Sequence, residues 1–202
     1  PLLYQPSRSV ITIHDVAFLF FPECFSFGLR SWLALACKIG IARAKKVITV
    51  SEAIRQDVLT HYGVAPEKVV TIHHGIHERF RKFDESFRPA IEQTTRKYRI
   101  QHPYILCIGT LQRRKNIPRL LQAFYLLKQQ YHIPHQLVLV GQKYSDLPEH
   151  EILSTINRLM LNQDVIWPGY IDEEEMPLLL NGAELFVLPS LYEGFGMPLV
   201  EA

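Results

Sequence analysis

The 202-residue sequence has little cysteine, no long apolar run and almost no net charge. Its three cysteines, Cys24, Cys37 and Cys107, are scattered and form no Cys-x-x-Cys pair, so a disulfide framework or zinc site is disfavoured and a reducing compartment is favoured. No run reaches the ~18 apolar residues that a membrane-spanning helix needs, and nothing predicts a signal peptide. These absences favour a cytoplasmic protein.

The 22 basic and 20 acidic residues nearly cancel and are interspersed, which argues against a nucleic-acid partner. Hydrophobic residues make up 48% of the chain, as in ordinary globular proteins. There is no Gly-x-Gly-x-x-Gly after an early strand and no Walker lysine pattern. Assignment of the chain to the dinucleotide-dependent oxidoreductases or to the P-loop proteins therefore loses its main support.

Short β-branched runs alternate with longer amphipathic stretches, which predicts an α/β protein with parallel strands. The expected strands are Val10–His14, Val47–Val50, Val69–His73, Tyr104–Gly109, Leu137–Gly141, Val165–Trp167 and Leu185–Leu188. The expected helices are Gly28–Lys45, Ser51–Tyr62 with Ser51 as N-cap and Gly63 as its stop, Pro118–Gln130 capped by Asn116, Glu149–Leu161, and Glu173–Asn181. The acidic run 172–175 would then serve the start of the last helix.

The charged stretch 79–102 has little strand signal and predicts a linker with one short helix. The expected domains are residues 1–80, a linker and helix at 81–102, and residues 103–202. Two Rossmann-like units result, with a cleft between them as the default ligand site.

The most informative segment is 189–202, where two carboxylates flank a glycine turn. Gly194 and Gly196, on either side of Phe195, permit unusual torsions and let main-chain N–H groups approach a ligand. Pro198 fits the first turn of a helix, whose N–H groups and dipole favour a phosphate. The N–H groups concerned are those of Gly196, Met197, Leu199 and Val200. Glu193 suits sugar hydroxyls and Glu201 a ribose hydroxyl, so the segment predicts a nucleotide-sugar site.

The segment also resembles the signature of the retaining GT-B glycosyltransferases of family 4, which include many mannosyl- and glucosyltransferases. Further matches follow in the family's order over nearly the whole chain: 12–15, 21–23, 47–52, 66–69, 74–76 and 104–111 followed by 113–116. The resemblance implies a GT-B-like fold of two Rossmann-like units facing a cleft, with residues 1–80 on the acceptor side and 103–202 binding the donor. The chain lacks an initial Met and ends where a helix begins. The resemblance therefore also implies that it is an internal fragment, truncated at both ends and inactive alone.

The loop from Gly109 to Asn116 follows a strand and precedes a helix, where open α/β sheets bind ligands. In the family a basic pair in this loop neutralises the diphosphate; Lys115 matches its lysine, and either Arg114 or Arg113 supplies the second charge. By the same resemblance His14 approaches the donor sugar and the turn at Tyr170 meets the nucleobase. The histidines at 73, 74 and 77 lack the helix and glutamate of a metallopeptidase motif, so we expect no metal.

The sequence therefore predicts a retaining hexosyltransferase with Glu193, Lys115 and His14 as catalytic residues and no cofactor. A GDP- or UDP-hexose, with mannose favoured, would donate to a saccharide or lipid-linked acceptor in polysaccharide or glycoconjugate synthesis. The alternative is a nucleotide-sugar-binding module without catalysis. For the apolar helix around Trp32, core packing is favoured over peripheral contact with the inner face of a membrane.

Overall fold

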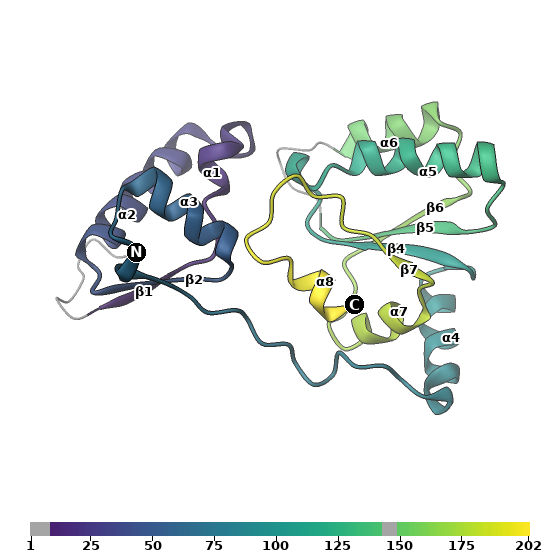
Figure 1. Cartoon of the computed structure of the whole chain (residues 1–202). Helices are drawn as coiled ribbons and strands as arrows, with labels where there is room; N and C mark the ends of the chain where they lie inside the picture. Colours follow the sequence, from purple (N-terminus) through teal and green to yellow (C-terminus); the bar gives the residue numbers. More distant parts are fainter. Residues whose placement is uncertain (1–8, 143–148) are drawn as a thin grey trace. The chain divides into compact units, whose positions relative to one another are not determined.

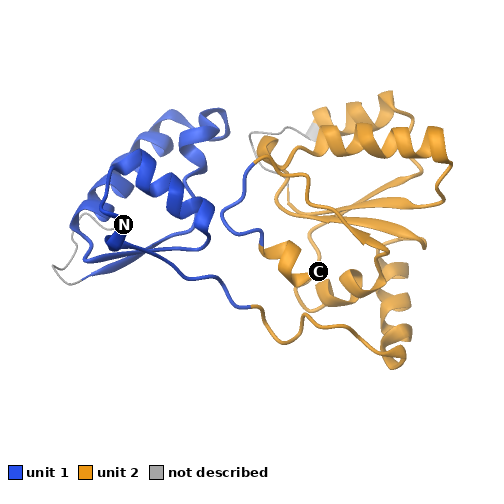
Figure 2. Ribbon diagram, in the orientation of Figure 1, with its two compact units in different colours: residues 1–75, 192–196 blue, residues 76–191, 197–202 orange. Residues whose placement is uncertain are grey.

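The computed structural model describes residues 9–142 and 149–202 and contains two parallel sheets (Figure 1). All seven predicted strands are present, with ends shifted by one or two residues. The chain divides into two compact units, one of residues 1–75 and 192–196 and the other of residues 76–191 and 197–202 (Figure 2). The domain boundaries expected from the sequence stay a prediction.

Unit 1 has a three-stranded sheet in the order β1-β2-β3. Its helices lie on one face of that sheet (Figure 1). The elements of unit 1 are β1 (Val10–Ile13), α1 (Ala17–Phe20), η1 (Pro22–Cys24), α2 (Phe27–Arg43), β2 (Lys46–Thr49), α3 (Glu52–Tyr62), η2 (Pro66–Lys68) and β3 (Val69–Thr71).

Serines start the two long helices of unit 1, and of these Ser51 was predicted as a cap from the sequence. The Ser26 hydroxyl accepts a hydrogen bond from the Leu29 N–H, and the Ser51 hydroxyl accepts one from the Ile54 N–H. Gly63 ends α3 in the left-handed conformation, which costs glycine little because it has no Cβ.

Unit 2 has a four-stranded parallel sheet in the order β6-β5-β4-β7. Helices α5 and α6 cover one face, and α4 and α7 cover the other (Figure 1). The elements of unit 2 are η3 (Glu85–Phe87), α4 (Arg88–Lys97), β4 (Tyr104–Ile108), η4 (Arg113–Lys115), α5 (Ile117–Tyr131), β5 (Gln136–Val140), α6 (Glu149–Arg158), β6 (Val165–Gly169), α7 (Met176–Gly182), β7 (Leu185–Phe186) and α8 (Met197–Glu201).

The side chains of β4 and β5 are buried on both faces of this sheet. Leu137 and Leu139 face α5 and α6, whereas Leu106 and Val138 belong to the core that includes Leu179 of α7. Helix α4 packs against α7, so the expected short helix of the linker is an integral part of unit 2. Among the described residues, no helix is both long and apolar enough to cross a bilayer.

Two capping predictions were wrong. Asn116 stands before α5, but it adopts a left-handed conformation and its side chain makes no cap. Helix α7 begins at Met176 instead of Glu173, so the acidic run lies in the preceding turn. There Glu175 accepts hydrogen bonds from Lys97 and Tyr98; burial raises the pKa of Glu175, but these bonds outweigh burial and the net shift is downward.

Candidate functional site

The strand order of unit 2 creates a topological switch point beside β4. The chain runs outward from β4 through β5 to β6, and β7 then returns to the other side of β4. Open parallel sheets bind ligands at such points, outside the carboxyl ends of the strands. The segments that follow β4 and β7 are therefore the structural candidates for the site.

Hydrogen bonds join these two segments. The Leu191 N–H donates to the Arg114 carbonyl at 2.8 Å, and the Asn116 side-chain amide donates to the Pro189 carbonyl at 3.3 Å. Asn116 thus connects the loop after β4 to the chain after β7 instead of capping α5. These bonds bring the basic loop to the start of the glutamate segment.

The ends of β4 and β5 approach too closely for a side chain between them. A Cβ on Gly141 would lie 2.0 Å from the Gly109 carbonyl oxygen, and Gly141 has a φ of +151°. A Cβ on Gly109 would meet the Lys115 side chain at 3.6 Å. The close approach explains glycine at 141, and a φ of +153° explains it at 109. The contact at Gly109 also places the Lys115 side chain at the end of β4.

Lys115 is buried, with 8% of its surface exposed. Burial raises the pKa of the nearby Cys107 thiol to about 12, and the Lys115 charge opposes that rise. A lysine at the end of a strand beside a topological switch point is a candidate for binding an anion, because ligands of open parallel sheets lie there.

The two neighbouring arginines differ in their burial. Arg113 is exposed, and its guanidinium lies 2.5 Å from the Glu151 carboxylate of α6, so that acid balances its charge. Arg114 is half-buried, and its carbonyl holds the chain at Leu191. The pairing with Glu151 disfavours Arg113 as the second cation of the site.

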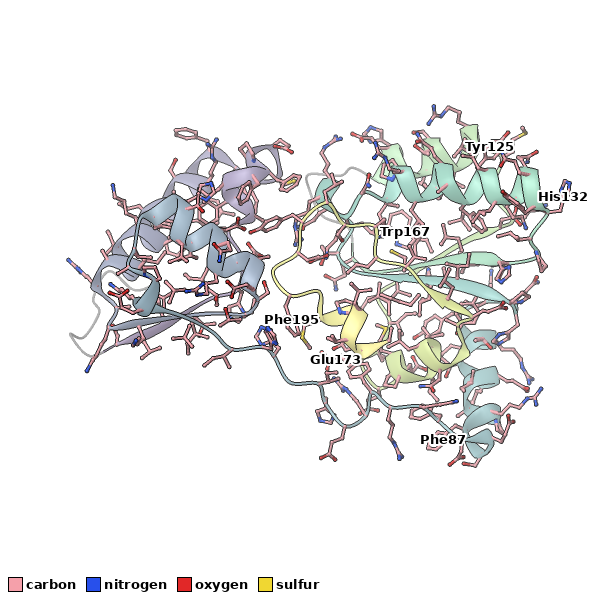
Figure 3. The ribbon with its side chains drawn as sticks, in the orientation of Figure 1. Phe87, Tyr125, His132, Trp167, Glu173 and Phe195 are labelled. Atoms are coloured by element: carbon pink, nitrogen blue, oxygen red, sulfur yellow. The ribbon has the colours of Figure 1, made fainter. Side chains whose placement is uncertain are left out.

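Two adjoining pockets open at the carboxyl ends of β4, β5 and β6. One of about 320 Å³ is lined by Gly109, Thr110, Tyr170 and Glu173, among others. The other, of about 530 Å³, shares Gly141, Gln142 and Tyr170 with it and adds Trp167 (labelled in Figure 3). These volumes suit a small organic ligand. Sequence reasoning selected Gly109 and Tyr170 but missed Gly141, although a glycine directly after a buried strand was a signal.

Glu201 lies at the end of α8, in which Pro198 occupies the first turn as expected. Burial raises the pKa of Glu201, the Arg79 charge opposes the shift and the Glu173 charge adds to it. Arg79 and Glu173 form an ion pair at 3.1 Å. Glu201 is thus within electrostatic range of Glu173, which lines the 320 Å³ pocket. Leu199 and Val200 are exposed.

The residues 192–196 pack within unit 1 (Figure 2). The Ser51 hydroxyl donates to the Gly194 carbonyl at 2.6 Å, and the Tyr192 hydroxyl donates to the Asp57 carboxylate at 2.7 Å. A Cβ on Gly194 would lie 2.0 Å from the His14 carbonyl oxygen. The structure therefore brings Glu193 and His14 into the same unit, with Gly194 pressed against the end of β1.

The histidines of unit 1 form a small cluster with Phe195. His14 Nδ1 lies 3.3 Å from His74 Nε2, and their rings are nearly parallel. Phe195, labelled in Figure 3, packs edge-on against His74 and also contacts His73. Within the part of the chain that the structure describes, no group of three or more His, Cys, Asp or Glu residues could hold a metal ion. The roles expected for all these site residues stay predictions.

The family model for glycosyl transferases group 1 matches residues 91–202, more than half of the chain. The chain belongs to this family. The model for Glycosyltransferase Family 4 matches residues 3–80. The strand order of unit 2, its switch point and the loops around it are thus those of a group 1 glycosyltransferase.

Two curated relatives are mannosyltransferases of Escherichia coli. The chain is 28% identical to O-antigen chain mannosyltransferase B over 207 residues, covering 100% of this chain and 53% of that protein. It is 31% identical to serotype-specific mannosyltransferase WbdA over 165 residues, covering 79% of this chain and 20% of that protein. The chain thus spans about half the length of the first relative.

Solved structures share the fold. HepE of Anabaena in complex with UDP and glucose has a TM-score of 0.74 at 23% identity, over 96% of this chain and 49% of that one. WaaG, a glycosyltransferase involved in lipopolysaccharide biosynthesis, has a TM-score of 0.74 at 20% identity, over 96% of this chain and 53% of that one. The predicted GT-B-like α/β fold is therefore confirmed.

Proposed function

We propose that the full-length protein is a retaining hexosyltransferase that moves a hexose, with mannose favoured, from a nucleotide-sugar to an acceptor hydroxyl. Membership in glycosyl transferases group 1 supports the reaction class. The mannosyltransferase relatives support the sugar and a role in polysaccharide synthesis. The observation that carries the proposal is the buried Lys115 beside Arg114 at the switch point of unit 2.

The two cations would act on the leaving group. During transfer the bond between the anomeric carbon and the diphosphate oxygen breaks, a bond from that carbon to the acceptor oxygen forms, and the leaving phosphate takes the acceptor proton. Negative charge grows on the diphosphate, and fixed positive groups in a water-poor site stabilise it strongly. Lys115 and Arg114 would carry this load without a metal ion.

The other site residues would hold the donor. Glu193 would accept hydrogen bonds from the sugar hydroxyls, with His14 approaching the same sugar, and Glu201 would accept one from the ribose. The main chain of Gly194, Phe195 and Gly196 and the first turn of α8 at Met197, Leu199 and Val200 would lie along the phosphates. The pockets at Gly109 and Tyr170 would take the nucleobase of a UDP- or GDP-sugar.

Replacing Lys115 by alanine in the full-length protein tests the proposal. Turnover should fall by roughly two to three orders of magnitude, the range for losing one charge-stabilising group. Lys128→Ala on α5 is a matched control, because it removes an equal charge, one that pairs with Asp164 at 2.7 Å. Initial rates with a panel of UDP-, GDP- and ADP-sugars would identify the donor. A Lys115→Ala variant within tenfold of the wild type would refute the assignment.

Two glutamate variants separate the sugar contact from the ribose contact. Glu193→Gln should abolish most transfer but leave the binding of free nucleotide unchanged, because the nucleotide lacks the sugar. Glu201→Gln should weaken the binding of nucleotide and nucleotide-sugar about equally. Calorimetry with both ligands measures this, and equal losses of nucleotide affinity in the two variants would contradict the roles. Nucleotide-sugar binding without turnover by the wild type would favour the non-catalytic alternative.

A further inference from the structure

Two histidines meet at the edge of the unit 1 sheet where its parallel strands end. His14 directly follows β1, and His74 follows β3, the strand on the far side of β2. Nδ1 of His14 and Nε2 of His74 are 3.3 Å apart, whereas the two ring centres are 5.3 Å apart. The two nitrogens therefore face each other across the gap between the rings. Their hydrogen bond connects the chain after β1 to the chain after β3.

The segment 192–196 contacts both members of this pair. Gly194 lies against the backbone of His14, where an added Cβ would be 2.0 Å from the carbonyl oxygen. Phe195 packs edge-on against the His74 ring, with the ring centres 5.4 Å apart. Neighbouring residues of one segment thus hold the backbone of the first histidine and the ring of the second. The same segment carries Glu193, the residue expected to bind the donor sugar.

The bond between the rings limits what His14 can offer a ligand. A neutral imidazole has one N–H donor and one bare acceptor nitrogen, and the partner of one nitrogen decides the state of the other. Because His74 engages Nδ1 of His14, Nε2 is the nitrogen that remains for a ligand. His14 is exposed and His74 is half-buried, so a ligand can reach the first ring while packing holds the second.

We propose that His74 is a positioning residue for sugar transfer. It engages Nδ1 of His14, fixes the tautomer and the orientation of that ring, and leaves Nε2 to hydrogen-bond the donor sugar. The inference rests on the function proposed above, in which His14 approaches the sugar. Orientation of a working imidazole through its other nitrogen is a general device in enzymes.

Protonation limits this arrangement. A hydrogen bond between two imidazoles needs one unprotonated nitrogen, so the bond is lost when both rings are charged. The other ionisable side chains on the neighbouring segments are Asp15, Glu52, His73 and Glu193. Asp15 accepts a hydrogen bond from the backbone of α1, and Glu52 accepts hydrogen bonds from side chains of its own helix. Transfer should therefore decline as acid charges the second ring of the pair.

Kinetics of three variants of the full-length protein test the inference. His74→Phe keeps a ring against Phe195 but removes the hydrogen bond, so it should lower kcat about five- to tenfold, the equivalent of one neutral hydrogen bond. Nucleotide affinity should change much less, because the nucleotide lacks the sugar. His74→Gln keeps a group that donates or accepts, and it should stay within about twofold of the wild-type kcat at neutral pH. The control is His132→Asn at the end of α5, labelled in Figure 3, which removes an exposed imidazole from a left-handed position that asparagine tolerates; it should match the wild type.

Two further measurements separate a positioning role from a merely structural one. In His74→Gln the amide oxygen can still accept from a protonated His14 ring, so kcat should decline less steeply toward acid pH than in the wild type. Nitrogen NMR spectra of full-length protein labelled at histidine report the tautomer directly. His14 should hold one tautomer in the wild type and mix two in His74→Phe. Identical acid declines in the wild type and His74→Gln, or mixed tautomers in the wild type, overturn the inference.

His14→Phe distinguishes failure of this inference from failure of the proposed function. If His14→Phe transfers sugar at the wild-type rate, the role proposed for His14 is wrong, and the inference fails with it. If His14→Phe strongly lowers transfer but His74→Phe does not, the proposed function stands and only the positioning role is overturned. The His74→Gln pH series remains informative if His74→Phe fails to fold.

Discussion

The close approach of Gly194 to β1 predicts that a side chain at residue 194 would displace the neighbouring Glu193. A methyl group at residue 194 would lie 2.0 Å from the His14 carbonyl oxygen, whereas ordinary contact begins at 3.4 Å. The Gly194→Ala substitution therefore forces the segment 192–196 away from β1 by about 1 Å or more. The backbone carbonyl of His14 cannot swing aside as a flexible side chain would.

Moving the segment strains its two anchors. These are the Ser51 bond to Gly194, at 2.6 Å, and the Tyr192 bond to the Asp57 carboxylate, at 2.7 Å. A neutral hydrogen bond contributes about 0.5–1.5 kcal/mol and one to a charged group about 1.5–3 kcal/mol. Losing both would cost about 2–4 kcal/mol, so unit 1 should also unfold at a lower temperature.

A displacement of about 1 Å at a reacting group can lower a rate by ~100-fold. We expect Gly194→Ala to lower sugar transfer by about that factor in the full-length protein. Nucleotide affinity should fall much less than the transfer rate, because the charged side chains proposed to bind the nucleotide, those of Lys115, Arg114 and Glu201, lie in unit 2 and keep their places. Initial rates and calorimetry measure the two quantities.

Gly28→Ala is the control, because a Cβ there meets nothing within 4 Å and the residue lies in α2. That variant should keep full activity and gain up to about 1 kcal/mol from helix propensity. The reasoning is refuted if Gly194→Ala transfers sugar at nearly the wild-type rate, since the segment would then tolerate a shift or have no part in holding the donor.

Three further predictions follow from single contacts. Gly141→Ala combines a backbone clash with a φ of +151° and should lower the free energy of unfolding by about 3 kcal/mol or more. Gly63→Ala has a positive φ but no clash, so its free energy of unfolding should fall by only about 1 kcal/mol. Denaturant titrations measure both variants, and equal losses of stability in Gly141→Ala and Gly63→Ala would contradict the clash at Gly141. Ser26→Ala removes a helix cap alone and should cost about 1 kcal/mol. Ser51→Ala removes both a helix cap and the Gly194 anchor, so Ser51→Ala should lower the free energy of unfolding by more and should also slow transfer. Burial raises the pKa of Glu201, so its carboxylate protonates earlier than an ordinary glutamate as pH falls, and nucleotide affinity should decline across that range. Calorimetry over a pH series should show this decline in the wild type and not in Glu201→Gln.

The sequence alone determined most local structure. Short apolar runs, most of them containing β-branched residues, marked the strands. Serines at 26 and 51 and glycine at 63 took up end positions of helices, as their small size favours. Serine at 26 was not anticipated as a cap, but its role follows from the same chemistry. These features depend on residues a few positions apart, so they can be read along the chain. The family was also readable, because its motifs are short and ordered.

Other sequence predictions failed because tertiary contacts competed with local preferences. Asn116 is a good helix cap in isolation, yet its amide donates to Pro189, 73 positions away, and its backbone is left-handed. Glu175 was expected to serve a helix start, yet it pairs with Lys97 and Tyr98 on a different segment. In both cases a polar side chain found a partner that only the packed structure supplies.

Only the tertiary structure decided how the site is assembled. The return of β7 to the side of β4 joins the basic loop to the chain at Leu191, and nothing in either sequence segment specifies that strand order. Likewise Gly194 meets the His14 carbonyl, and His14 meets His74 across 60 positions. The burial of Lys115 and the pairing of Arg113 with Glu151 also arise from packing. Periodicity and propensity act between near neighbours, whereas these contacts depend on sheet order and on a steric fit between distant backbones.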